Sequence, residues 1–293
     1  MPVSCNLCGA AVDRACDRRW LKDGFEILRC PSCGLLFRAD SPDPAELTRI
    51  YGEPYFRAAA GELHGQGYRD YVADEALHLR TARRRLERLE QLVEGRRLLD
   101  VGAAAGFFVA AARERGWDAA GVDVSPEMTA WARERLGVDV ATEAFASYEA
   151  PDAGLDAVTM WDYLEHSLDP ADDLAHAARL LRPGGVLALS TGDADAVVAR
   201  LSGRRWHLLT PRHHLFFFTR ATLLEYLARH GFEPVEIGYP GTSYPLDYVV
   251  HKLRTLVDVP LLDSAAERLA RMRVAVPLNL RDIVTVYARR RQT

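Results

Sequence analysis

The sequence predicts an α/β fold, in which helices cover both faces of a largely parallel sheet and a small metal-binding ribbon precedes the sheet. Three observations predict it. From residue 98 onward, short apolar strands alternate with amphipathic helices, as in βαβ units. The first of these strands ends in a small-residue loop with Gly102 and Gly106, which opens directly into a helix. Two Cys-x-x-Cys-Gly motifs lie before residue 35.

The composition sets broad limits on the protein. At 293 residues with 48% hydrophobic residues, the chain can fill one large core and a small appendage. A net charge of −4 gives no general attraction to nucleic acid or to an anionic membrane. No apolar run approaches the roughly 18 residues of a membrane span, and no signal peptide pattern begins the sequence. We therefore expect a cytoplasmic protein with no membrane partner, where paired cysteines more often bind metal than form disulfides.

The two cysteine motifs predict a structural zinc site. Cys5 and Cys8 form the first pair and Cys30 and Cys33 the second, so that two turns direct four thiolates to one point. Four protein ligands leave no open position for catalysis. The alternative, a redox Cys-x-x-Cys pair, needs only one such motif. Cys16 has no sequence partner and is expected to be a free thiol.

The segment between the ribbon and the sheet divides into a linker, an aromatic passage and a long helix. We place the zinc ribbon at 1–40, the linker, lid and long helix at 41–95, and the core at 96–293. The aromatic passage either forms a lid or attaches the ribbon to the core; it contains Tyr51, Tyr55, Phe56, Tyr68 and Tyr71. Apolar residues at spacings of three and four predict a helix over 72–93, whose arginine-rich opposite face is either solvated or contacts RNA.

The first half of the core reads as a nucleoside-binding βαβ unit. Strand 98–101 leads through the loop into helix 106–115, and strand 119–123 ends in a carboxylate, Asp123. A carboxylate there can accept both hydroxyls of a ribose at the carboxyl ends of the strands. Helix 126–136 follows with Ser125 as its N-cap, and 138–140 is a third strand.

The second half of the core continues the alternation. A proline-glycine turn at 182–185 separates the next helix from the next strand, and Thr219 is expected to cap a later helix. The predicted elements are strand 155–161, helix 170–181, strand 186–190, helix 220–230 and strands 232–237 and 282–288. The passage 241–275 is longer than a hairpin needs and is expected to be a substrate cap or a dimer contact.

The loop D-V-G-A-A-A-G at 100–106 resembles motif I of the class I S-adenosylmethionine methyltransferases, D-x-G-x-G-x-G, and Asp123 falls where that family holds the cofactor ribose. Ala104 replaces the middle glycine, a mild change if its φ is negative and a damaging one if it is positive. The L-E-H at 164–166 with Asp169 and Pro170 is similar to a signature of small-molecule methyltransferases. The Asn/Asp-Pro-Pro-Tyr tetrad of base N-methylating enzymes is absent.

The resemblance implies a Rossmann-like sheet of seven strands, with the last strand antiparallel, and S-adenosylmethionine as cofactor. The implied cofactor contacts are Asp100, Gly102, Ala103, Gly106, Phe107, Asp123, Val124, Ala144, Phe145 and Trp161. Phe145 falls where the family passes the adenine ring, and it either stacks on that ring or belongs to the core.

The stretch 206–219 holds the most site-like residues outside the cofactor motifs. It is similar to the E-H-L-x-x-F segment of methyltransferases that carry a zinc ribbon, including sugar C-methyltransferases, in which a histidine is a proposed base. His214 matches that histidine, and His213 stands where the family has Glu. His166 is a third candidate for proton transfer. The alternative for His214 and His166 is a structural bond to a backbone carbonyl.

The expected function is methyl transfer to an oxygen, carbon or nitrogen of a small molecule, in natural-product or sugar biosynthesis. One alternative is an RNA methyltransferase whose ribbon arginines contact RNA, although nucleic acid is not the expected partner. The other is an inactive binding protein, in which the alanines at 103–105 prevent the loop from binding the cofactor. A homodimer is compatible with the segment 241–275. The acceptor, the atom methylated and the identity of the base stay open.

Overall fold

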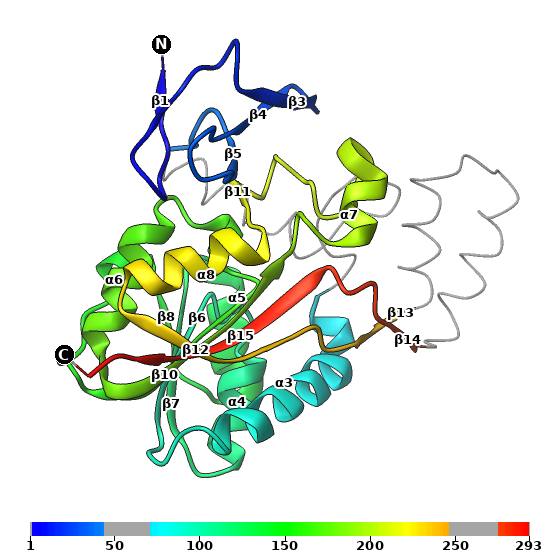
Figure 1. The fold of residues 1–293 in the computed structure, drawn as a ribbon. Helices are drawn as coiled ribbons and strands as arrows, with labels where there is room; N and C mark the ends of the chain where they lie inside the picture. Colours follow the sequence, from blue (N-terminus) through cyan, green and yellow to red (C-terminus); the bar gives the residue numbers. More distant parts are fainter. Residues whose placement is uncertain (1, 44–70, 246–274, 293) are drawn as a thin grey trace, which may run out of the picture.

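The computed structural model describes residues 2–43, 71–245 and 275–292 (Figure 1). The predicted lid aromatics before Tyr71 and most of the predicted cap fall in 44–70 and 246–274, outside the described residues. The described chain forms a central sheet with helices on both faces, and the ribbon lies over one end of it.

The central sheet has seven strands in the order β12-β15-β10-β9-β6-β7-β8, which confirms the predicted architecture. β15 runs antiparallel to both of its neighbours, β10 and β12, and the pairings of β10, β9, β6, β7 and β8 are parallel. The strands are β6 (Arg97–Val101), β7 (Asp118–Asp123), β8 (Val140–Thr142), β9 (Leu155–Trp161), β10 (Leu181–Gly192), β12 (Phe232–Gly238) and β15 (Ile283–Arg290).

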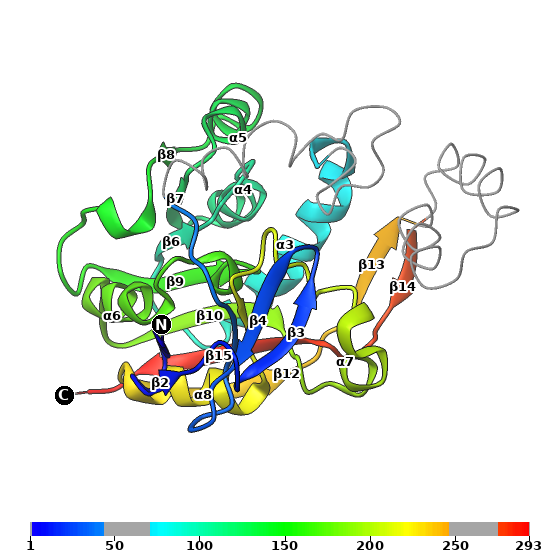
Figure 2. The same ribbon diagram turned by 90° about the horizontal axis from the view of Figure 1, so that it is seen from above.

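Alternate residues of a strand point to opposite faces of the sheet. Helices cover both of these faces (Figure 2). Leu99 and Val101 pack with α6 (Pro170–Leu180) and α8 (Arg220–Arg229). Leu98 packs on the other face with α3 (Glu75–Glu90) and α4 (Phe107–Glu114). The shorter helices are α5 (Pro126–Trp131) and α7 (Val197–Ser202). Because helices cover both faces, the strand ends and the loops that follow them are the parts of the described sheet where a site can form.

Local sequence signals set most helix ends. Ser125 accepts the Met128 N–H at the start of α5, and Thr219 forms a capping box at the start of α8, as predicted. The expected helix 126–136 has the predicted bounds, but it divides into α5 and a π-helical turn at Ala132–Leu136. Two other boundaries were wrong. β10 already begins at Leu181 and absorbs the proline-glycine turn as a register shift, and the third strand lies at Val140–Thr142 rather than at 138–140.

The ribbon forms two small sheets, and a strand from the core completes the larger one. β1 (Val3–Ser4) pairs with β2 (Ala11–Val12), and the larger sheet has the order β11-β5-β4-β3. Its ribbon strands are β3 (Arg18–Lys22), β4 (Phe25–Arg29) and β5 (Leu36–Arg38). The fourth strand, β11 (Phe216–Phe217), comes from the histidine stretch 206–219 of the core and pairs antiparallel with β5.

The passage after β12 leaves and returns through a two-stranded ladder. β13 (Thr242–Pro245) pairs antiparallel with β14 (Ala275–Leu278), so that Pro245 lies opposite Ala275. Residues 246–274 are therefore an insertion between two paired strands. Across the described ranges, no helix has the length and apolarity needed to cross a membrane.

Candidate active site

The loop after β6 requires its two glycines for different contacts. Gly102 has φ +69°, and a Cβ on it would lie 2.7 Å from Cδ2 of Tyr163. Gly106 has φ +74°, and its Cβ would lie 2.8 Å from a methyl of Val138. Any other residue at either position would combine backbone strain with overlap. Ala103, between them in the loop, is buried.

Asp123 is held in place by two backbone amides. Ala104 donates its N–H to Asp123 Oδ2 and Ser125 donates its N–H to Oδ1, each over 2.8 Å. The φ of Ala104 is +46°, so the substitution meets the second of the two conditions, the one expected to be damaging: an alanine stands in the left-handed conformation of a glycine. Burial raises the pKa of Asp123, while the two amides favour its charged form. Each carboxylate oxygen retains a lone pair with which to accept a ribose hydroxyl.

Asp100 lies beneath the loop, at the end of β6. Thr159 of the neighbouring strand β9 donates its hydroxyl to Asp100 Oδ1 over 2.5 Å. Burial raises the pKa of Asp100 to about 7. The structure therefore places this predicted cofactor residue between two strands, where it ties the loop to β9.

An aromatic cluster borders the loop around Phe107. Its ring stacks on His78 at 5.1 Å and lies 5.7 Å from Tyr71 and 5.4 Å from Trp131. Burial raises the pKa of Tyr71, and the charges of Asp100 and Asp123 act in the same direction. His78 and Trp131 were not predicted. For His78, the sequence did offer a signal: it follows Tyr71 by seven residues, a spacing that places two residues on the same face of a helix.

Arg85 brings a cation to the carboxyl end of β9. Its guanidinium lies 4.4 Å from the ring centre of Trp161, a predicted cofactor residue. Its Nη2 atom lies 3.2 Å from Ser190 Oγ and 3.4 Å from the carboxylate of Asp162. The arginine-rich face of α3 is thus not uniformly solvated, because Arg85 turns toward the sheet.

The loop after β8 places its predicted residues differently. Phe145 is buried, and its ring lies 4.6 Å from that of His176, so in this structure it belongs to the core. Ala144 is exposed, and Val124 at the end of β7 is half-buried.

Two of the three predicted histidines meet across the site. The rings of His166 and His214 lie edge to face at 4.7 Å. Nδ1 of His166 is 3.1 Å from the carbonyl oxygen of His213, and Nδ1 of His214 is 2.8 Å from that of Leu208. A carbonyl oxygen only accepts, so each Nδ1 carries the proton, and in the neutral ring Nε2 is the basic nitrogen. The backbone bonds expected for a structural role are present, and they fix the tautomer.

Glu165 completes this group and was missed as a site residue, although it lies in the L-E-H signature. One carboxylate oxygen of Glu165 and one ring nitrogen each of His166 and His214 lie within 4.8 Å of one another. Burial, together with the charge of Asp162, raises the pKa of Glu165 to about 8. Burial lowers the pKa of His166 to about 4, as it does that of His213. The group can exchange protons near neutral pH, and its nitrogen and oxygen donors can also hold a divalent cation.

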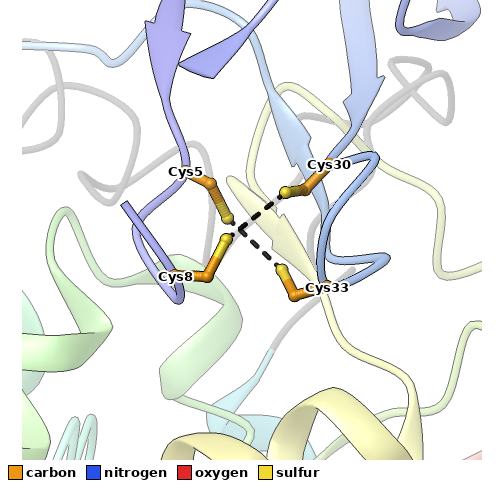
Figure 3. A group of neighbouring side chains, drawn as sticks. All are labelled: Cys5, Cys8, Cys30 and Cys33. Carbon is orange, nitrogen blue, oxygen red and sulfur yellow. Dashed lines mark hydrogen bonds between the residues drawn. The ribbon is translucent and has the colours of Figure 1, made fainter. Parts of the chain in front are cut away.

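The four ribbon cysteines converge on one point (Figure 3). Cys5 and Cys33 have their Sγ atoms 3.5 Å apart, as do Cys8 and Cys30, and all four sulfurs lie within 4.8 Å of one another. Zn–S bonds of about 2.3 Å in a tetrahedron imply sulfur–sulfur distances of about 3.8 Å, which these distances fit. Cys16 is exposed and is not part of the group.

Known proteins share this sequence pattern and fold. A ubiquinone biosynthesis O-methyltransferase of Aromatoleum aromaticum is 31% identical over 185 residues, 59% of this chain and 78% of the relative. One from Methylococcus capsulatus is 32% identical over 47% of this chain. The chain spans 62% of the Methylococcus relative and 42% of one from Alkalilimnicola ehrlichii, less than two thirds of their lengths.

Solved structures agree on the fold. A Burkholderia thailandensis 1,6-didemethyltoxoflavin-N1-methyltransferase superimposes with a TM-score of 0.52 and 19% identity over 94% of this chain and all of the other. A Thermotoga maritima S-adenosylmethionine-dependent methyltransferase gives a TM-score of 0.51 and 18% identity over 75% of this chain and 95% of the other. The profile of a methyltransferase domain family matches residues 71–237, more than half of the sequence. The chain therefore belongs to the class I S-adenosylmethionine-dependent methyltransferases.

Proposed function

We propose that the protein transfers the methyl group of S-adenosylmethionine to a hydroxyl of a small-molecule acceptor. The carboxylate of Asp123 carries this proposal, because the amides of Ala104 and Ser125 hold it at the strand ends where a ribose would lie. The relatives named ubiquinone biosynthesis O-methyltransferase favour oxygen as the methylated atom and a small molecule as the acceptor.

The residues of the site divide into two groups around the proposed reaction. Asp123 would hold the ribose hydroxyls, and the guanidinium of Arg85 would attract the carboxylate of the methionine part. When bound, S-adenosylmethionine supplies an electrophilic methyl on a positively charged sulfur. The protein's task is then to align an acceptor oxygen with that methyl and to take up its proton.

We assign proton uptake to the group formed by Glu165, His166 and His214. His166 and His214 have Nε2 as their basic nitrogen because their Nδ1 atoms donate to carbonyls. The lowered pKa of His166 keeps its ring neutral at physiological pH, the form that a base needs. We assign His214 as the base, with His166 packed against it.

The four cysteines would hold one structural zinc ion in the proposed enzyme. A closed set of four thiolates stabilises the ribbon and supplies no catalytic position. The ribbon's charges do not favour RNA. Arg14 and Arg18 both pair with Glu26, and the side chain of Arg38 is 1% exposed, so three of the cations available for RNA are already engaged.

Calorimetric titration with S-adenosylhomocysteine tests the cofactor site. The zinc-loaded wild type should bind, and Asp123→Ala should weaken binding by about 30-fold or more, since one charged hydrogen bond contributes about 2 kcal/mol. Asp118→Ala, at the exposed start of the same strand, is the matched control. A folded wild type that does not bind would instead support the inactive binding protein.

Transfer itself is tested with labelled S-adenosylmethionine and a set of phenols, catechols and short RNAs. Label in a phenol or catechol, lost in His214→Gln, would support the proposal. Label in RNA alone would reject the small-molecule acceptor.

A further inference from the structure

We propose that Arg38 is the positioning residue through which the amino-terminal ribbon fixes the histidine loop, defined here as residues 206–215. The inference deepens the proposed function, because the loop carries the histidine assigned as base. It makes the ribbon a part of the active-site scaffold rather than a separate binding module.

The backbone links the ribbon to the end of the loop. Phe216 and Phe217 pair antiparallel with Phe37 and Leu36, so the chain that leaves the histidine loop becomes an edge strand of the ribbon sheet. The N–H of Arg38 extends this pairing by donating to the carbonyl of Leu215 over 2.8 Å. The position of the loop's last residue is therefore set by β5.

The side chain of Arg38 holds the loop on the other side of the histidines. Its Nη1 donates to the carbonyl of Pro211 over 3.2 Å. Pro211 and Leu215 flank the three residues 212–214, so one ribbon residue holds both ends of the segment that contains His213 and His214. The described structure thus fixes a five-residue span from a single position.

A lysine could not make these contacts. Nε of Arg38 donates to the Asp40 carbonyl over 2.8 Å, and Nη2 lies 3.1 Å from the Asp40 carboxylate, while Nη1 reaches Pro211. Three nitrogens of one planar fork serve separate acceptors, whereas an ammonium is a single point. The guanidinium also lies over the ring of Phe25, 4.7 Å from its centre, which limits its movement.

The same loop connects onward to the acid-base group. Leu215 donates its N–H to the Glu165 carbonyl over 2.8 Å, and the His213 carbonyl accepts from Nδ1 of His166. Displacing residues 211–215 would therefore release the bond that fixes the tautomer of His166. Arg38 acts on the imidazoles through the backbone and touches neither ring.

The zinc site lies directly upstream of this contact. Cys30 accepts the N–H of Gly34 and donates its own N–H to Leu35, and β5 begins at the next residue. Metal coordination by Cys30 and Cys33 would thus hold the turn that leads into Arg38. Loss of the metal should loosen the histidine loop together with the ribbon.

Nitrogen-15 spectra of the imidazoles test the proposal in the full, zinc-loaded chain. In the wild type, His166 and His214 should show protonated Nδ1 and unprotonated Nε2. Arg38→Met should retain zinc and S-adenosylhomocysteine binding but shift these signals toward mixed tautomers, and Arg38→Lys should not restore them. Arg29→Met, an exposed arginine of the same ribbon, should leave them unchanged. Wild-type signals in Arg38→Met would overturn the proposal.

Hydrogen exchange on the wild type covers the case in which Arg38→Met does not fold. Zinc chelation should speed amide exchange in residues 206–217 together with the ribbon, while β6 and β7 stay protected. Exchange confined to the ribbon would overturn the proposal. Neither measurement depends on turnover, so failure of methyl transfer in the acceptor set would leave this result standing.

Discussion

Ala104 donates its N–H to Asp123 Oδ2 over 2.8 Å from a left-handed backbone conformation, with φ +46°. An L-residue in this conformation costs about 1–2 kcal/mol. The alanine at this motif position has therefore not changed the path of the loop. It retains the geometry that aims the amide at the carboxylate, at a cost in backbone strain.

Ala104→Gly should raise the free energy of unfolding by about 0.5–1 kcal/mol. Glycine removes the left-handed strain, and its greater freedom in the unfolded chain offsets part of the gain. Urea unfolding measures the change. Ala103→Gly is the control, and it should lower the stability by about 0.5–1 kcal/mol because Ala103 is buried and has no positive φ. If both variants lost the same free energy of unfolding, Ala104 would carry no backbone strain.

Glu165→Gln should flatten the dependence of stability on pH. Burial raises the pKa of Glu165 to about 8, and an unfolded glutamate has a pKa of about 4.3. The native state therefore keeps a proton that the unfolded state releases, and this contribution to stability is present below about pH 4.3 and is lost as the pH rises through about 8. Asp100 and Asp173, with pKa values of about 7 and about 6, act in the same direction in both proteins.

Urea midpoints between about pH 5 and pH 8.5 check this prediction. The wild type should lose more stability than the variant as the pH rises. Parallel curves for the two proteins would show that the proton is not held at Glu165.

Cys33→Ser should abolish stoichiometric zinc binding. Three thiolates remain, and the fourth ligand position of the tetrahedron is lost. Elemental analysis of the purified protein should give one zinc per wild-type chain. Cys16→Ser should keep that value because Cys16 is exposed and outside the cluster. Zinc loss in the Cys16 variant would place a further ligand in the site.

Asn6→Ala should lower the free energy of unfolding by about 1–2 kcal/mol. Asn6 lies between Cys5 and Cys8 and joins this turn to the core. Its side-chain amide donates to the Asp169 carboxylate over 2.9 Å and accepts a hydrogen bond from the Tyr226 hydroxyl over 2.7 Å. Tyr226→Phe removes only the second bond and should cost about 1 kcal/mol. The two effects should be non-additive in the double variant. Additivity would mean that the hydroxyl does not act through Asn6.

The parts of the fold that were predictable depend on local sequence. Ser125 and Thr219 mark helix starts through side chains that reach the next turn, and the strands follow from apolar runs between glycines. The cysteine spacing likewise predicted the convergence of four thiolates. Such features involve neighbouring residues, so one sequence is sufficient to find them.

The site was only partly predictable because its other contacts join distant segments. Arg85 lies within an arginine-rich helix face, and nothing local distinguishes it from its neighbours until β9 places Trp161 beside it. The pairing of Phe216 with Phe37 spans about 180 residues of chain and has no local signature. The sequence left Phe145 with two alternatives, stacking on the adenine ring or packing in the core. Its ring packs against that of His176, which places it in the core of this structure.

The position of β15 has a consequence for biosynthesis. It is the last strand in chain order, yet it lies between β10 and β12 and pairs with both. During translation β12 leaves the ribosome with no neighbour in the sheet, and it must wait for residues 283–290 before it can be incorporated. The central sheet is therefore completed only after residues 283–290 have been made, and until then the edge of β10 stays unpaired and open to a chaperone.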